Sequence, residues 1–213
     1  MGAELDHIVV GCADLASGER WLTDLLGVEA QGGGVHETMG THNKLWSLGE
    51  AYLELIAVNP DAPAPPRRRW YALDDHTVQG RLSQGPHLLT WVVRVDDLDT
   101  AMEAAPVDMG TALDVSRGDL SWRMAVPDDG ALHDQGQIPY LIQWKGAKPT
   151  DAMQAQGLSL ASLTAFAPQA VMVERVLDAV GAKGMIDVQG GRMRSELIAE
   201  IATPENGNVS LVG

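Results

Sequence analysis

Two polar side chains stand out because the strands predicted to carry them are otherwise apolar. His7 lies in an apolar run at residues 5–12, and Glu54 is the only charge between residues 52 and 58. Side chains alternate along a strand, so His7 should share a face with Leu5. A lone carboxylate among apolar neighbours is costly unless it is paired, hydrated or bound to a metal. We expect His7 and Glu54 to point into a cleft, or to form a hydrogen-bonded buried pair.

Two further histidines could act near neutral pH. His42 stands beside Asn43 just before a predicted strand, where the two polar side chains would point into the mouth of a cleft. His36 precedes them across a turn that contains glycine. Both histidines could bind substrate by hydrogen bonds or move a proton, and His42 is the candidate for catalysis. The structural alternative is that they stabilise the turn through bonds to the backbone.

A second polar group surrounds an aromatic residue near the middle of the chain. Arg117 and Asp119 precede Trp122. The guanidinium could hold a substrate carboxylate or phosphate, or it could pair with Asp119 across the turn. Trp122 is interpreted as part of the core or as a wall of the cleft.

The elements that would hold these residues recur along the chain. Asp14 caps a helix that follows the first strand, and a glycine-rich connection at residues 32–34 leads to strands at 43–48 and 52–58. Strand, helix and three strands return in the same order from residue 87, with Asp97 as the matching cap, 83 residues after Asp14. A third, looser copy closes the chain.

This repetition predicts an α+β fold of βαβββ modules, two of which form a cleft while the third is a C-terminal module. The boundaries are residues 1–59, 87–146 and 157–213, with a Pro- and Arg-rich linker at 60–86. Arg67, Arg68 and Arg69 in this linker form either a solvated turn or a clamp for an anionic group. Ligand pockets are common at junctions of this kind, and the cleft closes either within one chain or across a homodimer.

Composition excludes several classes of function. The formal net charge of −14 argues against binding to nucleic acid or to anionic membrane surfaces, and no apolar run is long enough for a membrane span. One cysteine and a start without a secretory signal indicate a reducing cytoplasm. The sequence has no P-loop and no dinucleotide fingerprint, so we expect no nucleotide cofactor.

Several segments together resemble a known superfamily. Leu5-Asp6-His7-Ile8 and Tyr52-Leu53-Glu54-Leu55-Ile56 look like the vicinal oxygen chelate superfamily, which includes glyoxalase I and the extradiol dioxygenases. The segment Gly40-Thr41-His42-Asn43 ahead of the second of these resembles the glyoxalase-like domain proteins of that superfamily. The resemblance spans residues 5 to about 144 well and the last third loosely.

The resemblance implies a metal site with one ligand from the first strand and one from the fourth strand of each of two modules. In this sequence the first module supplies His7 and Glu54, which suit a divalent ion. The second module supplies Thr90, from the offset of 83, and Gln143, near the position of Glu54. Thr90 and Gln143 are poor ligands for transition metals, so we treat both as substrate-binding candidates.

The leading hypothesis is a small-molecule enzyme of the vicinal oxygen chelate type. A divalent ion on His7 and Glu54, completed by water or Gln143, would bind adjacent substrate oxygens during isomerase, lyase or dioxygenase-like chemistry. Glu54 would also take part in catalysis. The alternative is a metal-free protein of the same fold that binds or sequesters a small molecule.

Overall fold

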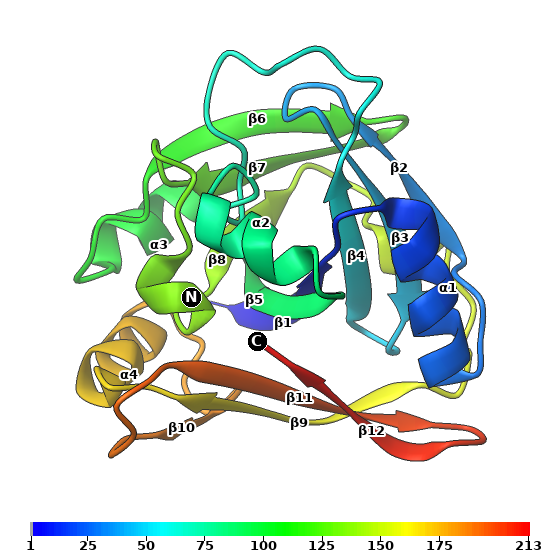
Figure 1. Cartoon of the computed structure of the whole chain (residues 1–213). Helices are drawn as coiled ribbons and strands as arrows, with labels where there is room; N and C mark the ends of the chain where they lie inside the picture. Colours follow the sequence, from blue (N-terminus) through cyan, green and yellow to red (C-terminus); the bar gives the residue numbers. More distant parts are fainter. Residues whose placement is uncertain (1) are drawn as a thin grey trace.

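The computed structural model describes residues 2–213, and its strands form two sheets. The larger sheet has eight strands in the order β2-β3-β4-β1-β5-β8-β7-β6, and Figure 1 shows it curving above the smaller one. Its strands are β1 (Ala3–Gly11), β2 (Gly32–His36), β3 (Thr41–Ser47), β4 (Tyr52–Val58), β5 (His87–Val95), β6 (Thr111–Arg117), β7 (Leu120–Val126) and β8 (Tyr140–Trp144).

The smaller sheet contains the strands of the C-terminal module in the order β10-β9-β11-β12. These strands are β9 (Ser159–Phe166), β10 (Asp187–Gln189), β11 (Glu196–Thr203) and β12 (Gly207–Val212). The helices are α1 (Leu15–Leu26), α2 (His76–Leu82), α3 (Leu98–Ala104) and α4 (Ala170–Ala179), with short 3₁₀ turns η1 (His133–Gly136) and η2 (Pro149–Asp151). In the described part of the chain, none of the helices has the length and apolar character needed to span a membrane.

Each of the first two modules is a βαβββ unit, as the sequence predicts. Asp14 and Asp97 cap α1 and α3 by accepting hydrogen bonds from Ser17 N and Thr100 N, and Gly27 ends α1 in the left-handed conformation. One expectation was wrong: the glycine-rich stretch at residues 32–34 begins β2 and is not a connection. Glycine has a low strand propensity, so the glycine-rich sequence did not indicate a strand here. Pairing with β3 stabilises β2.

A pseudo-twofold axis relates the two modules through the antiparallel pair β1–β5. His7 pairs with Val92, and Val9 pairs with Thr90. Thr90 lies 83 residues after His7, and Val92 lies 83 residues after Val9, so the two pairs are equivalent. This confirms the offset of 83 between Asp14 and Asp97. The edge strands β2 and β6 approach each other, so the sheet curves into a half-barrel with an inner and an outer face.

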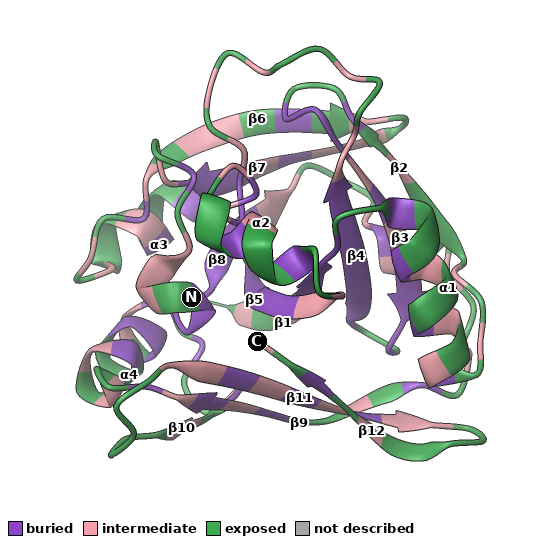
Figure 2. Ribbon diagram, viewed as in Figure 1, coloured by how far each residue is buried: buried purple, intermediate pink, exposed green. Residues whose placement is uncertain are grey.

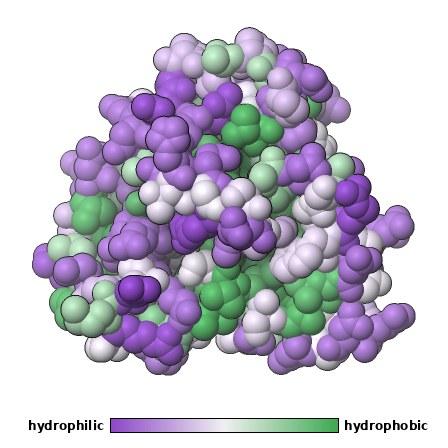
Figure 3. Space-filling model, viewed as in Figure 1, coloured by the Kyte–Doolittle hydropathy of each residue, from purple (hydrophilic) through white to green (hydrophobic). Residues whose placement is uncertain are grey.

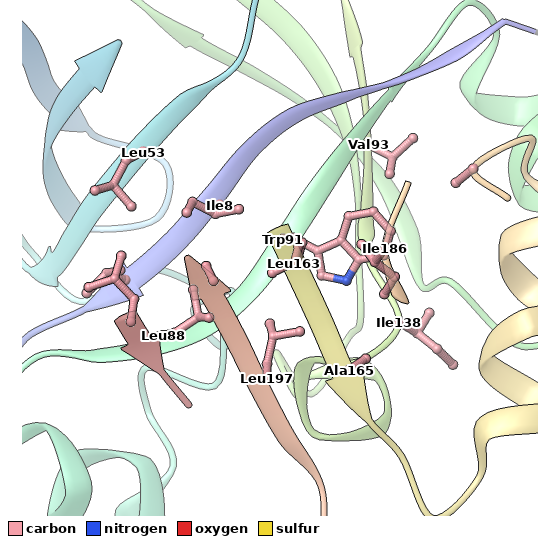
Figure 4. Close-up of a cluster of buried hydrophobic side chains, with 14 of the residues drawn as sticks. Ile8, Leu53, Leu88, Trp91, Val93, Ile138, Leu163, Ala165, Ile186 and Leu197 are labelled. Atoms are coloured by element: carbon pink, nitrogen blue, oxygen red, sulfur yellow. The ribbon is translucent and has the colours of Figure 1, made fainter. Parts of the chain in front are cut away.

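Two apolar clusters occupy the two faces of the large sheet. In the outer cluster α1 packs against β3 and β4, α3 packs against β7 and β8, and the small sheet packs against β5, as the buried residues in Figure 2 indicate. Figure 4 shows Leu163, Ala165 and Leu197 of the small sheet over Ile8 and Trp91. The third module therefore covers the outer face of the first two.

The inner cluster contains the aromatic residues of the linker as well as α2. Trp70 and Tyr71 are each 2% exposed, so part of the linker enters the half-barrel. In Figure 3 the apolar residues visible from this side gather toward the small sheet, while hydrophilic residues frame them.

Candidate functional site

A small cavity opens from the inner face of the half-barrel. The enclosed space that a water molecule can occupy is about 20 Å³, and the free space including the mouth is about 310 Å³. A space of the smaller size holds about one water molecule. Its lining combines polar and aromatic or apolar side chains: His7, His36, Asn43, Tyr52, Glu54, Trp70, Tyr71, Arg117, Trp122, Met124, Ile142 and Trp144.

A β-bulge in β1 aims two neighbouring side chains at the same place. Leu5 pairs with Val93 and His7 pairs with Val92, so Asp6 is an extra residue in the strand. Strict alternation predicts that Leu5 shares the face of His7, but Leu5 packs on the outer cluster instead. The bulge lets the buried Asp6 carboxylate reach the ring of His7, with 2.7 Å between Oδ1 and Nδ1.

The other ring nitrogen of His7 faces Glu54. His7 Nε2 and Glu54 Oε2 are 3.5 Å apart, and both residues are buried. Trp144 Nε1 donates to the second Asp6 oxygen over 2.8 Å, so the indole holds this carboxylate against the histidine. The ring of Tyr52 stacks on His7 with 4.5 Å between centroids. The imidazole orientation is therefore fixed from three sides.

Asn43 connects Glu54 to the opposite edge of the sheet. Its Nδ2 donates to Glu54 Oε1, and its Oδ1 accepts from Gly34 N over 2.9 Å and from Arg117 Nη1 over 2.7 Å. These contacts fix which end of the amide faces the carboxylate. A side chain on β3 thereby orients both an anion and a cation of the site.

His36 is neutral in this arrangement. Asn43 Nδ2 lies 3.4 Å from His36 Nε2, so Nε2 accepts, and Nδ1 donates to Thr41 Oγ1 over 3.1 Å. Burial lowers the pKa of His36 to about 4, and the positive charges of Arg117 and His7 add to this effect. His36 can accept a proton or a hydrogen bond at Nε2 without first losing a proton at neutral pH.

His7 has the opposite protonation preference. Burial alone would lower the pKa of His7, but the hydrogen bonds and charges of Asp6 and Glu54 outweigh it and raise the pKa to about 9. Burial alone would raise the pKa of Glu54, but His7 and Asn43 hold it well below its usual range. The pair is thus an imidazolium and a carboxylate in a site that excludes most water.

The linker supplies one wall of the cavity. The Trp70 ring lies edge-on to His36, with centroids 5.1 Å apart, and Tyr71 lies edge-on to Tyr140 at 4.9 Å. Tyr71 and Ala72 both have φ in the left-handed region, at 57° and 54°. Such a conformation is costly for residues other than glycine and persists only where the surrounding structure holds it. Arg67 and Arg69 hold this segment through hydrogen bonds to protein groups.

Three residues singled out in the sequence lie elsewhere. His42 pairs with Ala57 and lies in a surface depression next to α1, so it is on the outer side of β3 while Asn43 is on the inner side. Thr90 is buried, and its hydroxyl donates to the carbonyl of Gly136 over 3.2 Å. Gln143 accepts from Leu98 N and donates to the carbonyl of Asp96, so its amide stabilises the start of α3.

The strand register also changes which residue corresponds to Glu54. Val9 pairs with Glu54, and Val92, its counterpart, pairs with Tyr140. In the second module, Tyr140 therefore occupies the position equivalent to Glu54, which the comparison of the two modules by sequence gives to Gln143. The Tyr140 hydroxyl donates to the carbonyl of Ala131 over 2.8 Å and accepts from Tyr71 N. The second module offers hydroxyl groups that are already bonded to the protein.

The first module has donor groups that suit a divalent ion. Metal-bound histidines commonly donate their second ring N–H to a carboxylate, as His7 does to Asp6. Two ligands at about 2.1 Å on a tetrahedral ion lie about 3.4 Å apart, close to the 3.5 Å between His7 Nε2 and Glu54 Oε2. Residues 2–213 contain no group of three or more His, Cys, Asp or Glu residues able to hold a metal. An ion held by these two protein ligands would take its other ligands from water and substrate.

Sequence reasoning missed three residues that complete this site. Asp6 is hidden because a bulge cannot be read from strand alternation. Trp70 and Tyr71 lie in a linker that proline and arginine dominate. A signal was available for the last two, since an adjacent aromatic pair in a polar segment is expected to find a buried surface.

Comparisons with protein families and with solved structures gave the following matches. The profile of a family described as a glyoxalase-like domain matches residues 5–181. A hypothetical protein from Staphylococcus aureus aligns with 100% of this chain and 85% of its own, with 16% identity and a TM-score of 0.59. Methylmalonyl-CoA epimerase from Mycobacterium tuberculosis aligns with 70% of this chain and 91% of its own, with 19% identity and a TM-score of 0.44. No curated protein matches the chain.

Proposed function

Because the chain belongs to the glyoxalase-like domain family of the vicinal oxygen chelate superfamily, we propose that it is an enzyme acting on a small molecule with two adjacent oxygens. One observation carries this proposal. His7 and Glu54 are buried side by side at a cavity, and Asp6 and Asn43 orient them. A buried cluster of ionisable groups in a cavity is typical of a catalytic site.

The proposed site includes a divalent ion on His7 Nε2 and Glu54. When bound, the ion would supply a Lewis acid that stabilises negative charge on the substrate oxygens. Asp6 would keep the proton on His7 Nδ1, and the ion would take the place of the proton on Nε2. Trp122 and Trp144 would form a wall that excludes water from the reacting groups.

Within this proposal His36 is the group that moves a proton. Its ring is neutral and lines the cavity, and its Nε2 would accept the proton in place of the hydrogen bond from Asn43 Nδ2. Arg117 would hold the substrate in place, and Asn43 would keep Arg117 and Glu54 in position. Proton transfer next to an oxygen-stabilised charge is common to isomerase and lyase chemistry, so these reaction classes are the first to screen.

Metal binding tests the proposal directly. The protein is freed of metal with EDTA and titrated with Zn²⁺, Mn²⁺, Ni²⁺ and Fe²⁺ by calorimetry. We expect one ion per chain for the wild type and no binding for His7→Gln with Glu54→Gln, whose folding is checked by circular dichroism. The matched control is His76→Gln with Glu103→Gln, because both residues are exposed. A wild-type protein that binds none of the four ions contradicts the metal part of the proposal.

A second candidate function has its own observation. Thr90 and Tyr140 hold the ligand positions of the second module, and both hydroxyls are bonded to backbone carbonyls. This favours a metal-free protein that binds or sequesters a small molecule between aromatic walls. Thermal-shift measurements separate the two functions: stabilisation by small aromatic compounds with no response to divalent ions favours binding alone.

A further inference from the structure

One cation at the cavity has no acidic partner. Arg117 is among the cavity-lining residues, and its Nη1 donates to Asn43 Oδ1 over 2.7 Å. Within residues 2–213, the ion pairs of the structure do not include Arg117, and Asn43 is its hydrogen-bond partner. The pairing with Asp119 that the sequence leaves open is therefore not formed. Arg117 thus differs from Arg69 and Arg123, which pair with Asp74 and Asp99 and do not line the cavity.

The fold makes room for this arginine. A Cβ on Gly34 would lie 2.8 Å from Arg117 Cδ and 3.3 Å from Cγ, so any larger residue would push the side chain away. Gly34 does not have a φ in the left-handed region, so its backbone conformation does not itself require glycine. The stem of Arg117 crosses from β6 over β2, and the absence of a side chain at Gly34 permits the crossing.

A second donor at the same cavity has no hydrogen-bond partner. Trp70 lines the cavity and is 2% exposed, yet its indole Nε1 is buried without a hydrogen-bond partner in the described structure. A buried N–H without a partner costs about 1–3 kcal/mol. Buried groups of this kind call for an explanation, and a ligand that accepts the hydrogen bond provides one.

We infer that Arg117 and Trp70 form a subsite for a substrate carboxylate, which makes the substrate a small 2-oxo or 2-hydroxy acid. This inference rests on the proposed function. Arg117 and Trp70 would bind the carboxylate, and the ion on His7 and Glu54 would bind the neighbouring 2-oxo or 2-hydroxy oxygen. A guanidinium pairs with a carboxylate through two parallel hydrogen bonds, and the indole N–H adds a third donor.

The experiment compares acids with their uncharged esters. Pyruvate, its 2-hydroxy analogue lactate, and 2-oxoglutarate are each paired with the fully methylated ester, and binding is followed by thermal shift and calorimetry. We expect the wild type to be stabilised by at least one acid and not by its ester. Arg117→Gln should weaken the binding of that acid about 10- to 100-fold, and Trp70→Phe, which keeps the ring but loses the N–H, about 5- to 10-fold.

Two further variants keep the test independent of a lost charge or a damaged fold. Gly34→Ala retains Arg117 but displaces it, and it should weaken acid binding without a change in net charge. Arg123→Gln is the matched control, because Arg123 pairs with Asp99 on the surface and does not line the cavity. Its acid binding should equal that of the wild type.

The outcomes separate the subsite from the proposed function. Equal binding of acids and esters, no binding of any acid, or acid binding that Arg117→Gln leaves unchanged would each overturn the carboxylate subsite. The metal titration of His7 and Glu54 variants does not depend on this result. Acid binding that depends on Arg117 in a protein that takes up no ion would leave the subsite standing while the metal proposal fails.

Discussion

The charge state of His7 gives a sharp prediction for stability against pH. Its pKa is raised from 6.5 in the unfolded chain to about 9, so the folded protein holds this proton more tightly. The stabilisation is fully present below pH 6.5 and is lost as the pH rises through 9. Since a tenfold change in proton affinity corresponds to about 1.4 kcal/mol, the complete effect is about 3 kcal/mol, of which about 2 kcal/mol disappears between pH 7 and pH 9.

Urea unfolding followed by tryptophan fluorescence measures this loss in the metal-free protein in EDTA. His36 acts with the opposite sign, because its lowered pKa stabilises the fold above pH 6.5, but that contribution is nearly complete by pH 7. Burial raises the pKa of the Cys12 thiol to about 12, so its ionisation in the unfolded chain adds a smaller loss near pH 9. The variant His7→Gln retains these contributions and isolates that of His7.

The result that refutes this reasoning is equally specific. A free energy of unfolding that stays level or rises between pH 7 and pH 9 would show that His7 is not an imidazolium in the folded protein. The same slope in the wild type and in His7→Gln would show that another group carries the pH dependence. Either outcome would remove the imidazolium–carboxylate pair from the description of the site.

Two further predictions concern positions away from the cavity. Gly136 has φ of 94° and a Cβ there would lie 2.0 Å from the carbonyl oxygen of Leu89, so Gly136→Ala should lower the free energy of unfolding by more than about 2 kcal/mol. Gly80 lies in α2 with nothing within 4 Å of a Cβ, so Gly80→Ala should not destabilise, and a loss like that at Gly136 would contradict the argument. Cys12 is buried with a pKa raised to about 12, so the native protein should react with a thiol reagent at least about 100-fold more slowly than the protein in urea; equal rates would show an accessible thiolate.

Much of the fold follows from local patterns in the sequence. The capping residues Asp14 and Asp97 mark equivalent helices, and the pairing of β1 with β5 bears out the offset between them. Apolar alternation locates most of the strands, because one face of each strand must be buried. Alternation did not predict the strand at residues 32–34, because glycine has no side chain to show a pattern.

The candidate site was predictable in part. His7 and Glu54 are recognisable because a polar residue in an apolar strand needs a partner, and the structure makes them neighbours. The position of His42 beside Asn43, just before a predicted strand, favours His42 over His36, yet the register of β2 against β3 turns His42 outward and leaves His36 inside. A one-residue change in register reverses the face of every side chain, and the sequence around Gly40 does not fix that register.

By itself, then, the sequence determined the repeated βαβββ units, the acidic surface and the two polar residues that interrupt apolar strands. These are local properties, because side-chain periodicity and capping act over a few residues. Tertiary structure alone decided that Asp6 reaches His7 through a bulge, that Tyr140 corresponds to Glu54, and that linker and sheet edge bring Trp70 and Arg117 to one cavity. These contacts join residues far apart in the chain, so they depend on strand register and on closure of the sheet.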